Sequence, residues 1–257
     1  MNKIPYVFII NLKARSDRRE HMIQLMKDLN LNQYEFVEPL KVKEGIGRMN
    51  KNELSLILTV KNILDTARAR SLDKCMIFED DVIINDNKPA NYVRDKITEA
   101  ITSLPSDPSL WDLLYLEYCY ESCKDIIPYN NVLYKVSAPW CTASIIYNCN
   151  TNSINKIFRC LDKYMLTLDA SYSACFKADE LYGFMIYPPL FYQDDGFNTN
   201  IEASNVLMSI KHMVEGGNRK NICKGNYKQT AYTNITFICI VSILIYVLSV
   251  LFVVYYI

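Results

Sequence analysis

The sequence lacks an excess of charge of either sign. Its 257 residues include 28 Lys and Arg and 28 Asp and Glu, so the formal net charge is zero. A protein whose main task is to neutralise a nucleic-acid backbone carries a basic excess, because its affinity depends on Lys and Arg at the phosphates. The balance therefore argues against nucleic acid as the main partner.

Histidine is scarce, with two residues, and the nine cysteines lack the paired spacing of a zinc site. Cys119 and Cys123 form a lone CxxxC without a second Cys or His pair at ligand spacing, so no structural zinc is expected. Cys75 lies in an apolar strand and Cys239 in an apolar C-terminal run, which leaves few cysteines for a disulfide framework. We expect most cysteines to be reduced and buried.

Charge is missing altogether from the last part of the chain. Every formal charge lies at or before Lys228, and the 23 residues 235–257 also contain no proline or glycine. This length is enough to span the ~30 Å hydrocarbon core of a bilayer, whereas a buried core helix normally has a polar stripe. The sequence predicts a domain at 1–205, a basic linker at 206–234 and one transmembrane helix at 235–257.

Within 1–205, strand and helix patterns alternate. YVFIINL (6–12), QYEFVEPL (33–40) and CMIFEDD (75–81) read as strands. An amphipathic helix with apolar residues at i, i+3, i+4 and i+7 follows the first, and a long apolar helix at 50–70 follows the second. This order predicts an α/β fold with right-handed crossovers and a mainly parallel central sheet. Ligands of such sheets bind outside the carboxyl ends of the strands.

Charged residues follow two of these strands. The third predicted strand ends in Glu79-Asp80-Asp81, and the first is followed by Arg15, Arg18 and Arg19. Arginine forks match phosphate oxygens, and carboxylates hold a hard divalent cation that also binds phosphate. The two clusters predict a site for a metal-bound diphosphate. The alternatives are a solvated acidic turn and, for Arg19 above all, arginines that only solvate a helix face.

These segments resemble a known family of enzymes. FIINLKARSDRREHM (8–22), MIFEDDV (76–82), WDLLYL (111–116), Leu168-Asp169 and YPPLFYQDD (187–195) occur in the order typical of glycosyltransferase family 25. This family includes lipooligosaccharide and collagen galactosyltransferases. The resemblance implies a GT-A-type fold, which is a Rossmann-like nucleotide-sugar-binding fold. The resemblance spans roughly residues 4–200 and so covers the whole predicted domain.

The resemblance also implies a reaction. Members of family 25 transfer a hexose, commonly galactose or glucose, from a UDP-sugar to an acceptor hydroxyl, with inversion at the anomeric carbon. They use Mn²⁺ or Mg²⁺ to stabilise the leaving diphosphate. The acceptor here would be a glycan, a lipid-linked saccharide or a protein hydroxyl. Asp81 and Asp80 are the expected metal ligands and Asp169 the expected catalytic base, although Asp169 fits a helix N-cap equally well.

Further residues are assigned to the two substrates. The expected donor-binding residues lie near the ends of the first and third strands: Asn11, Leu12, Arg15, Arg18, Glu79 and Asp80. Trp140 and Asp194 are candidate acceptor contacts, and a surface turn is the alternative for Asp194.

Two segments depart from the family pattern. Thr59-Val60 stand where members usually carry Ser-His, and Glu117 follows the WDL segment where members usually have Gly. A side chain without a polar group at position 60 cannot contact donor or acceptor by hydrogen bonding. The departures keep open a second hypothesis, a catalytically inactive glycosyltransferase-fold membrane protein that acts as a scaffold or binding module.

The charges also predict an orientation. Five Lys and Arg between residues 211 and 228 precede the apolar segment and no charge follows it, so the positive-inside bias places the domain in the cytosol on a C-terminal tail anchor. The N-terminal run YVFII is too short for a secretory signal. Because animal members of the family are lumenal, a lumenal domain in the secretory pathway is the alternative.

Overall fold

The computed structural model of the chain describes residues 4–47, 49–85, 88–118 and 127–194. The predicted linker (206–234) and transmembrane helix (235–257) lie outside the described residues. None of the helices in the described part is both long enough and apolar enough to cross a bilayer.

A central sheet organises the described domain. Six of its eight described strands run in one direction, and β7 and β8 run in the other. The predicted α/β fold with a mainly parallel sheet is therefore confirmed, and the two reversed strands introduce antiparallel pairings inside the sheet, since each lies between two other strands. The strand order is β2 (Tyr34–Val37), β1 (Tyr6–Ile10), β3 (Lys74–Glu79), β8 (Ser144–Asn148), β5 (Leu113–Tyr115), β9 (Gly183–Ile186), β7 (Leu133–Lys135), β6 (Ile127–Pro128).

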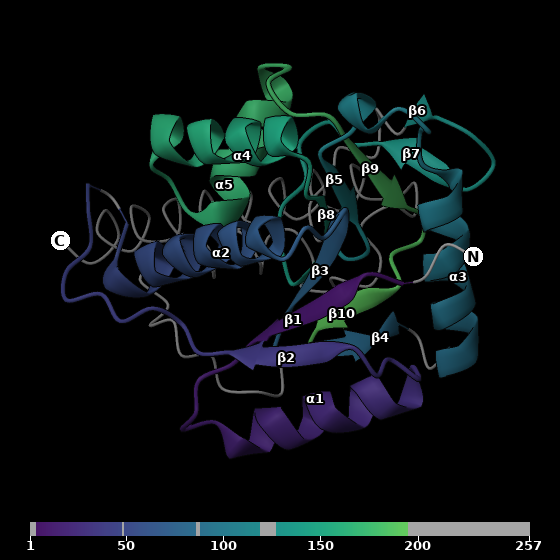
Figure 1. The fold of residues 1–257 in the computed structure, drawn as a ribbon, viewed down its shortest axis with the longest axis horizontal. Coiled ribbons are helices and arrows are strands. Elements are labelled where there is room, and N and C mark those ends of the chain that lie inside the picture. The colour runs from purple at the N-terminus through teal and green to yellow at the C-terminus, as the bar shows by residue number, and fades with distance from the viewer. Residues whose placement is uncertain (1–3, 48, 86–87, 119–126, 195–257) are drawn as a thin grey trace, which may run out of the picture. The chain divides into compact units, whose positions relative to one another are not determined.

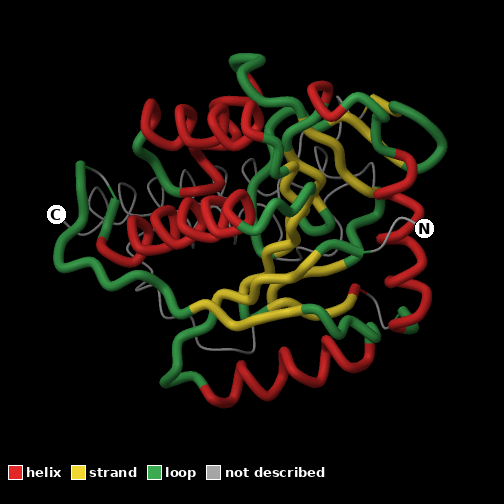
Figure 2. The backbone as a smooth tube through the Cα atoms, viewed as in Figure 1, coloured by secondary structure: helices red, strands yellow, loops and turns green. Residues whose placement is uncertain are grey.

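The described helices form a layer on each face of this sheet (Figures 1 and 2). Helices α2 (Lys51–Ala69), α4 (Thr151–Tyr164) and α5 (Leu168–Lys177) contribute to one hydrophobic core. Helices α1 (Ser16–Asp28) and α3 (Ala90–Ser103) contribute to the other.

Strand β1 shows why its sequence is apolar without interruption. Phe8 and Ile10 belong to the core beneath α2, whereas Val7 and Ile9 belong to the core beneath α1. Alternate side chains of a strand point to opposite faces, so a strand covered on both faces needs apolar residues at every position.

The first three strands create a switch point at the carboxyl end of the sheet. Strand β1 pairs in parallel with β2 on one side and with β3 on the other, and α1 and α2 form the two crossovers. After β1 the chain therefore crosses to β2 on one side of β1, and after β2 it crosses back over β1 to β3 on the other side. In open α/β sheets this reversal opens a crevice between the two strand ends, where ligands bind.

A small second sheet lies beside this switch point. Strand β4 (Val82–Ile84) follows β3 almost at once and pairs antiparallel with β10 (Phe191–Gln193), with Gln193 opposite Val82. The backbone N–H of Asp194 also donates to the carbonyl oxygen of Asp81, at 2.8 Å. The last described strand is thereby fixed next to the acidic triplet.

The WDL segment has a structural role at the opposite edge of the sheet. Asp112, buried at the start of β5, accepts hydrogen bonds from the Ser153 hydroxyl (2.7 Å) and the Tyr182 backbone N–H (2.9 Å). The Lys156 ammonium is 3.3 Å from the same carboxylate. Asp112 therefore joins β5, α4 and the entry to β9.

The expectation that most cysteines are reduced is wrong for the described residues. Cys160 and Cys175 form a disulfide between α4 and α5, and Cys141 is also disulfide-bonded, whereas Cys75 and Cys149 are buried free thiols. The sequence did not show the first pair, because the two cysteines meet only when α4 and α5 pack together.

We predict that loss of the Cys160–Cys175 disulfide lowers stability. The closed loop is 15 residues long, and a loop of this length contributes about 3 kcal/mol. The variant Cys160→Ala/Cys175→Ala should lose about this free energy of unfolding in a denaturant titration. Peptide mapping of the wild type without reductant gives the control, because it should yield one cross-linked peptide pair. Alkylation of both thiols before reduction would contradict the disulfide.

Candidate functional site

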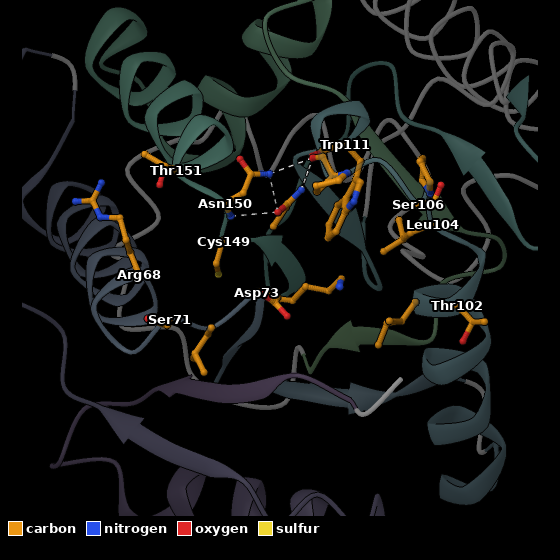
Figure 3. Close-up of a pocket in the computed structure, with 16 residues that line it drawn as sticks. Arg68, Ser71, Asp73, Thr102, Leu104, Ser106, Trp111, Cys149, Asn150 and Thr151 are labelled. Carbon is orange, nitrogen blue, oxygen red and sulfur yellow. Dashed lines mark hydrogen bonds between the residues drawn. The ribbon is translucent and has the colours of Figure 1, made fainter. Parts of the chain in front are cut away.

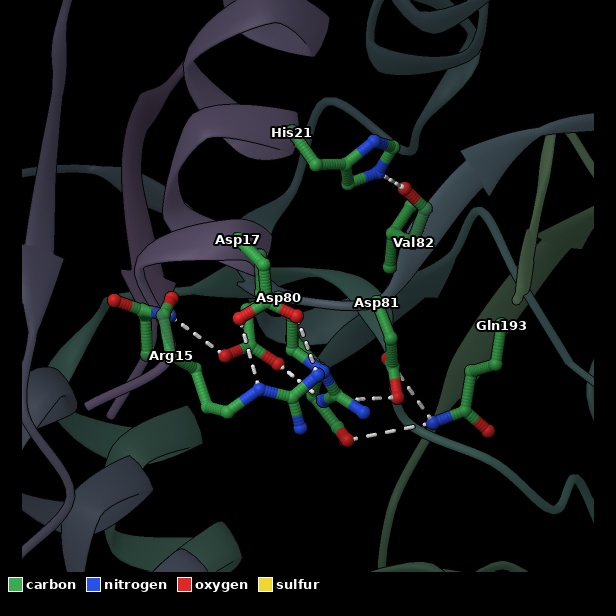
Figure 4. Close-up of polar contacts among 10 residues, drawn as sticks. Arg15, Asp17, His21, Asp80, Asp81, Val82 and Gln193 are labelled. Carbon is green, nitrogen blue, oxygen red and sulfur yellow. Dashed lines mark hydrogen bonds and ion pairs between the residues drawn. The ribbon is translucent and has the colours of Figure 1, made fainter. Parts of the chain in front are cut away.

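Three side chains meet at the switch point between β1 and β3. The Asn11 amide donates to Asp80 Oδ2 at 2.8 Å, and the Arg18 guanidinium donates to Asp80 Oδ1 at 2.6 Å (Figure 4). All three residues are buried. Asn11 follows β1, Asp80 follows β3 and Arg18 lies in the first turns of α1, so the fold itself brings them together.

The acidic triplet is divided by these contacts. Asp80 uses both carboxylate oxygens on Asn11 and Arg18, whereas Arg18 reaches Asp81 only at 3.4 Å. Glu79 accepts a 3.0 Å hydrogen bond from the Thr142 hydroxyl. Buried arginine thus compensates Asp80 most directly, and Glu79 and Asp81 less.

The electrostatics follow this division. Burial, and after it the charge of Asp81, raise the pKa of Glu79 to about 8, and the Thr142 hydrogen bond only partly opposes them. The pKa of Asp81 is also raised, first by burial, although the Arg18 charge opposes the shift. Charged carboxylates at this position are therefore costly unless a cation approaches.

Gln193 is a residue of this site that sequence reasoning missed. Its amide nitrogen lies 3.4 Å from Glu79 Oε2 and 3.5 Å from Asp81 Oδ1. In Figure 4 this nitrogen is directed at Asp81. The signal in the sequence was faint, because Gln193 is distant along the chain and only the pairing of β10 with β4 places it here.

The expected donor-binding residues of the first loop differ in position. Arg15 forms a bidentate ion pair with Asp17, with Nε 2.9 Å from Oδ1 and Nη2 2.7 Å from Oδ2. That hydrogen bond is the largest cause of the raised pKa of Arg15, and the charges of Asp80 and Asp81 add to it. The Leu12 side chain is exposed, and its carbonyl oxygen accepts from the Arg15 N–H at 2.8 Å. Arg15 is therefore near the triplet but paired locally.

Arg19 points elsewhere. Its guanidinium lies 3.8 Å from the centre of the Phe36 ring, which is a cation–π contact between α1 and β2. This geometry agrees with the alternative of a residue that serves the helix surface.

The predicted base lies within electrostatic reach of the cluster. Asp169 is in the first turn of α5, where Oδ1 accepts from the Thr167 hydroxyl (2.6 Å) and the Ala170 N–H (2.8 Å). The residue at the N-cap position is Thr167. The charge of Asp169 is among the causes that raise the pKa of Glu79, so the two carboxylates interact electrostatically.

The two candidate acceptor contacts are less well defined. Asp194 is next to the cluster through its backbone bond to Asp81. Trp140 is half-buried in the loop between β7 and β8. Their roles toward an acceptor stay predictions.

The two departures from the family pattern have structural explanations. Val60 is buried in the core, and the Thr59 hydroxyl accepts from the Leu40 N–H (2.9 Å) while donating to the Ser55 carbonyl (2.6 Å). These positions therefore hold the loop that follows β2. Glu117 is buried after β5, at the same edge as the triplet, and accepts from the Ala143 N–H at 3.2 Å.

The chemistry of the donor set fits a hard divalent cation. No group of three or more His, Cys, Asp or Glu in the described ranges is arranged to hold a metal by itself. Magnesium, however, is commonly bound by one or two carboxylates together with substrate phosphates. Glu79 and Asp81 supply two, and the buried Asn11 Oδ1 has no hydrogen-bond partner among the described residues. A buried acceptor of this kind calls for a donor or a cation.

A cavity of about 720 Å³ lies at the edge of the sheet opposite the switch point (Figure 3). Its amide groups serve the protein itself, since Asn148 donates to the carbonyls of Pro108 and Trp111 at 2.7 and 2.9 Å. Asn150 donates in turn to Asn148, at 2.9 Å. This cavity contains none of the predicted site residues.

No model of a known protein family matches the chain. Among solved structures, it is similar to a glycosyltransferase involved in the glycosylation of the major capsid of PBCV-1, with 13% identity, 76% of this chain and 95% of that chain covered and a TM-score of 0.43. It is also similar to mannose-1-phosphate geranyltransferase from Thermus thermophilus, with 9% identity, 75% of this chain and 76% of that chain covered and a TM-score of 0.40. A third similar structure is UDP-glucose pyrophosphorylase complexed with UDP-glucose, with 9% identity, 75% of this chain and 92% of that chain covered and a TM-score of 0.39. Similarity at this level says nothing about the chemistry of this chain, and membership of family 25 stays a prediction.

We predict that Glu79 makes stability depend on pH in the absence of metal. The unfolded chain loses this proton near the ordinary pKa of 4.5 and the folded protein near 8. The folded state therefore holds the extra proton between these values, and the free energy of unfolding falls as pH rises through them.

Glu79→Gln should make this fall shallower in denaturant titrations with EDTA at several pH values. The exposed residue Glu44 provides the control, because Glu44→Gln should keep the wild-type slope. An unchanged slope in Glu79→Gln would show that Glu79 titrates normally.

Proposed function

We propose that the described domain is a metal-dependent glycosyltransferase of GT-A type, which moves a hexose, galactose or glucose, from a nucleotide diphosphate sugar to a hydroxyl acceptor. The contact that carries the proposal is the Asn11–Asp80–Arg18 cluster at the switch point, beside two incompletely compensated carboxylates. The resemblance of the sequence to family 25 supplies the substrate class.

The donor diphosphate would lie at the carboxyl end of β3. Each oxygen of Asp80 already accepts a hydrogen bond, from Asn11 or Arg18, so Asp80 would order the loop, and Glu79 and Asp81 are the residues that would hold Mn²⁺ or Mg²⁺. When bound, such an ion neutralises the charge that develops on the leaving diphosphate. Arg15 is close enough to Asp80 and Asp81 to be coupled to them, and it would exchange Asp17 for a phosphate oxygen.

Asp169 would take the proton of the acceptor hydroxyl. Both of its hydrogen bonds within the described part are accepted by Oδ1, which leaves Oδ2 for the acceptor. A carboxylate in hydrogen-bond reach of a hydroxyl serves as a general base. Trp140 and Asp194 would contact the acceptor, which is a glycan, a lipid-linked saccharide or a protein hydroxyl.

One observation favours the second candidate function, an inactive scaffold or binding module. Val60 is buried and Thr59 is bonded to Leu40 and Ser55, so neither side chain offers a polar group to a donor. A protein with this function would keep the fold without binding a nucleotide-sugar.

Donor binding and hydrolysis separate the two candidates. For the glycosyltransferase we expect UDP with Mn²⁺ to raise the melting temperature of the full chain, and one UDP-sugar of a panel to be hydrolysed slowly. Absence of both effects across the panel would favour the scaffold.

Two substitutions should separate the roles of the carboxylates. Asp81→Asn removes a charged ligand but no core contact, so it should abolish turnover and metal-dependent UDP binding while the protein stays folded. Asp169→Asn should keep UDP binding and depress transfer. The exposed Asp162→Asn is the control and should behave as wild type. Equal loss of UDP binding in both active-site variants would show that Asp169 is not the base.

The disulfides bear on the orientation. Disulfides persist in oxidising compartments and are rare in the cytosol, where thiols are kept reduced. Cys141, Cys160 and Cys175 therefore favour the lumenal alternative over the cytosolic placement expected from the basic linker. We propose a domain on the lumenal side, anchored by the predicted transmembrane helix at 235–257.

Protease digestion of sealed microsomes tests this orientation. Residues 1–205 should resist added protease until detergent opens the membrane. Digestion without detergent would instead place the domain in the cytosol and show that the basic residues decide the topology.

A further inference from the structure

Strand β10 has a specific effect at the acidic triplet: it brings Gln193 to the end of β3. Gln193 is opposite Val82 in the small sheet, and the next backbone N–H, of Asp194, donates to the carbonyl of Asp81 at 2.8 Å. The end of this side chain is consequently held beside Glu79 and Asp81 by backbone bonds on both strands.

The distances from Gln193 do not suit strong hydrogen bonds. N–H···O bonds in proteins are commonly 2.7–3.2 Å long, whereas the amide nitrogen lies 3.4 and 3.5 Å from the two carboxylates. Neighbouring oxygen ligands about 2.1 Å from one octahedral ion are about 3.0 Å apart. The amide nitrogen of Gln193 is therefore within about half an ångström of the ligand spacing from each of the two carboxylates.

The polar groups around Gln193 also call for positive charge. Glu79 and Asp81 are next to each other without a fully compensating arginine, because Arg18 is bonded most closely to Asp80. Asn11, which is 3% exposed, has a buried Oδ1 without a hydrogen-bond partner among the described residues. This unpartnered acceptor is an observation independent of the carboxylates. The nitrogen of the same Asn11 amide donates to Asp80.

We propose that Gln193 is a ligand of the divalent cation, which it binds through its carbonyl oxygen together with Glu79 and Asp81. This inference rests on the proposed function and adds a residue to its metal site. Without the cation, the amide nitrogen faces the two carboxylates and offsets part of their repulsion. With the cation, a half-turn of the amide exchanges nitrogen for oxygen, since the two ends have nearly the same shape.

The inference is tested by metal binding without any nucleotide. The full chain, purified in detergent, is titrated with Mn²⁺ and free Mn²⁺ is followed by electron paramagnetic resonance. Gln193→Leu should weaken Mn²⁺ binding about tenfold or more, and Gln193→Glu should tighten it, because one removes an oxygen ligand and the other supplies a charged one. The matched control is Gln24→Leu on the exposed side of α1, which should bind as wild type.

A second readout separates a ligand from a residue that only orders the loop. In protein labelled with ¹³C at the glutamine side-chain amide carbon, electron–nuclear double resonance should detect a ¹³C nucleus close to bound Mn²⁺. This coupling should vanish in Gln193→Leu and persist in Gln24→Leu. The melting temperatures of the metal-free variants show whether each variant is folded. If Gln193→Leu does not fold, Gln193→Glu tests the same position.

The outcomes distinguish this inference from the proposed function. Wild-type Mn²⁺ affinity in Gln193→Leu, with binding lost in Asp81→Asn, would overturn the role of Gln193 and leave the metal site intact. Absence of Mn²⁺ binding to the wild type would overturn both. Mn²⁺ binding through Gln193 without UDP-sugar binding would support the cation site and overturn the glycosyltransferase.

Discussion

The buried ion pair between Arg18 and Asp80 is the interaction on which the candidate site depends. It links the first turns of α1 to the end of β3, and Asn11 joins it from the end of β1. Removal of one partner from such a pair typically costs ~3–5 kcal/mol, because the other charge stays buried without compensation. The pair consequently fixes the loop after β3, and the positions of Glu79 and Asp81 follow from it.

The pair also explains how three adjacent carboxylates can be tolerated. Asp80 is neutralised inside the fold, while Glu79 and Asp81 are left with a hydroxyl, an amide and a longer contact to Arg18. The protein thus separates the charge that supports the structure from the charge that is available to a ligand. Their raised pKa values are the measure of that separation.

Local patterns were sufficient to predict the elements around the switch point. The apolar runs that contain β1 and β3, and the amphipathic helix between β1 and β2, follow from period and composition alone. With the rule for open α/β sheets, they brought the arginines and the triplet to one edge. The division of labour within the triplet did not follow, because it depends on which oxygen meets Arg18 after packing.

Contacts between distant segments were beyond such patterns. Gln193 reaches the triplet through a strand of three residues, and the meeting of Cys160 with Cys175 depends on the packing of α4 on α5. From the sequence, Thr59 and Val60 looked like the loss of two functional side chains. In the structure Val60 packs in the core and Thr59 hydrogen-bonds the loop after β2. A residue that lacks the polar group expected from the sequence can instead contribute to packing.

The late position of β10 has a consequence for the way the domain acquires its site. The contacts of Gln193 with Glu79 and Asp81 span sequence separations of 114 and 112 residues, whereas Asn11, Arg18 and Asp80 belong to the first third of the chain. During synthesis from the N-terminus, the βαβαβ half can assemble while the partner of β4 is still unmade. Contacts of high sequence separation close slowly because of their loop entropy. The acidic end of β3 therefore cannot be complete until nearly the whole described domain has been synthesised.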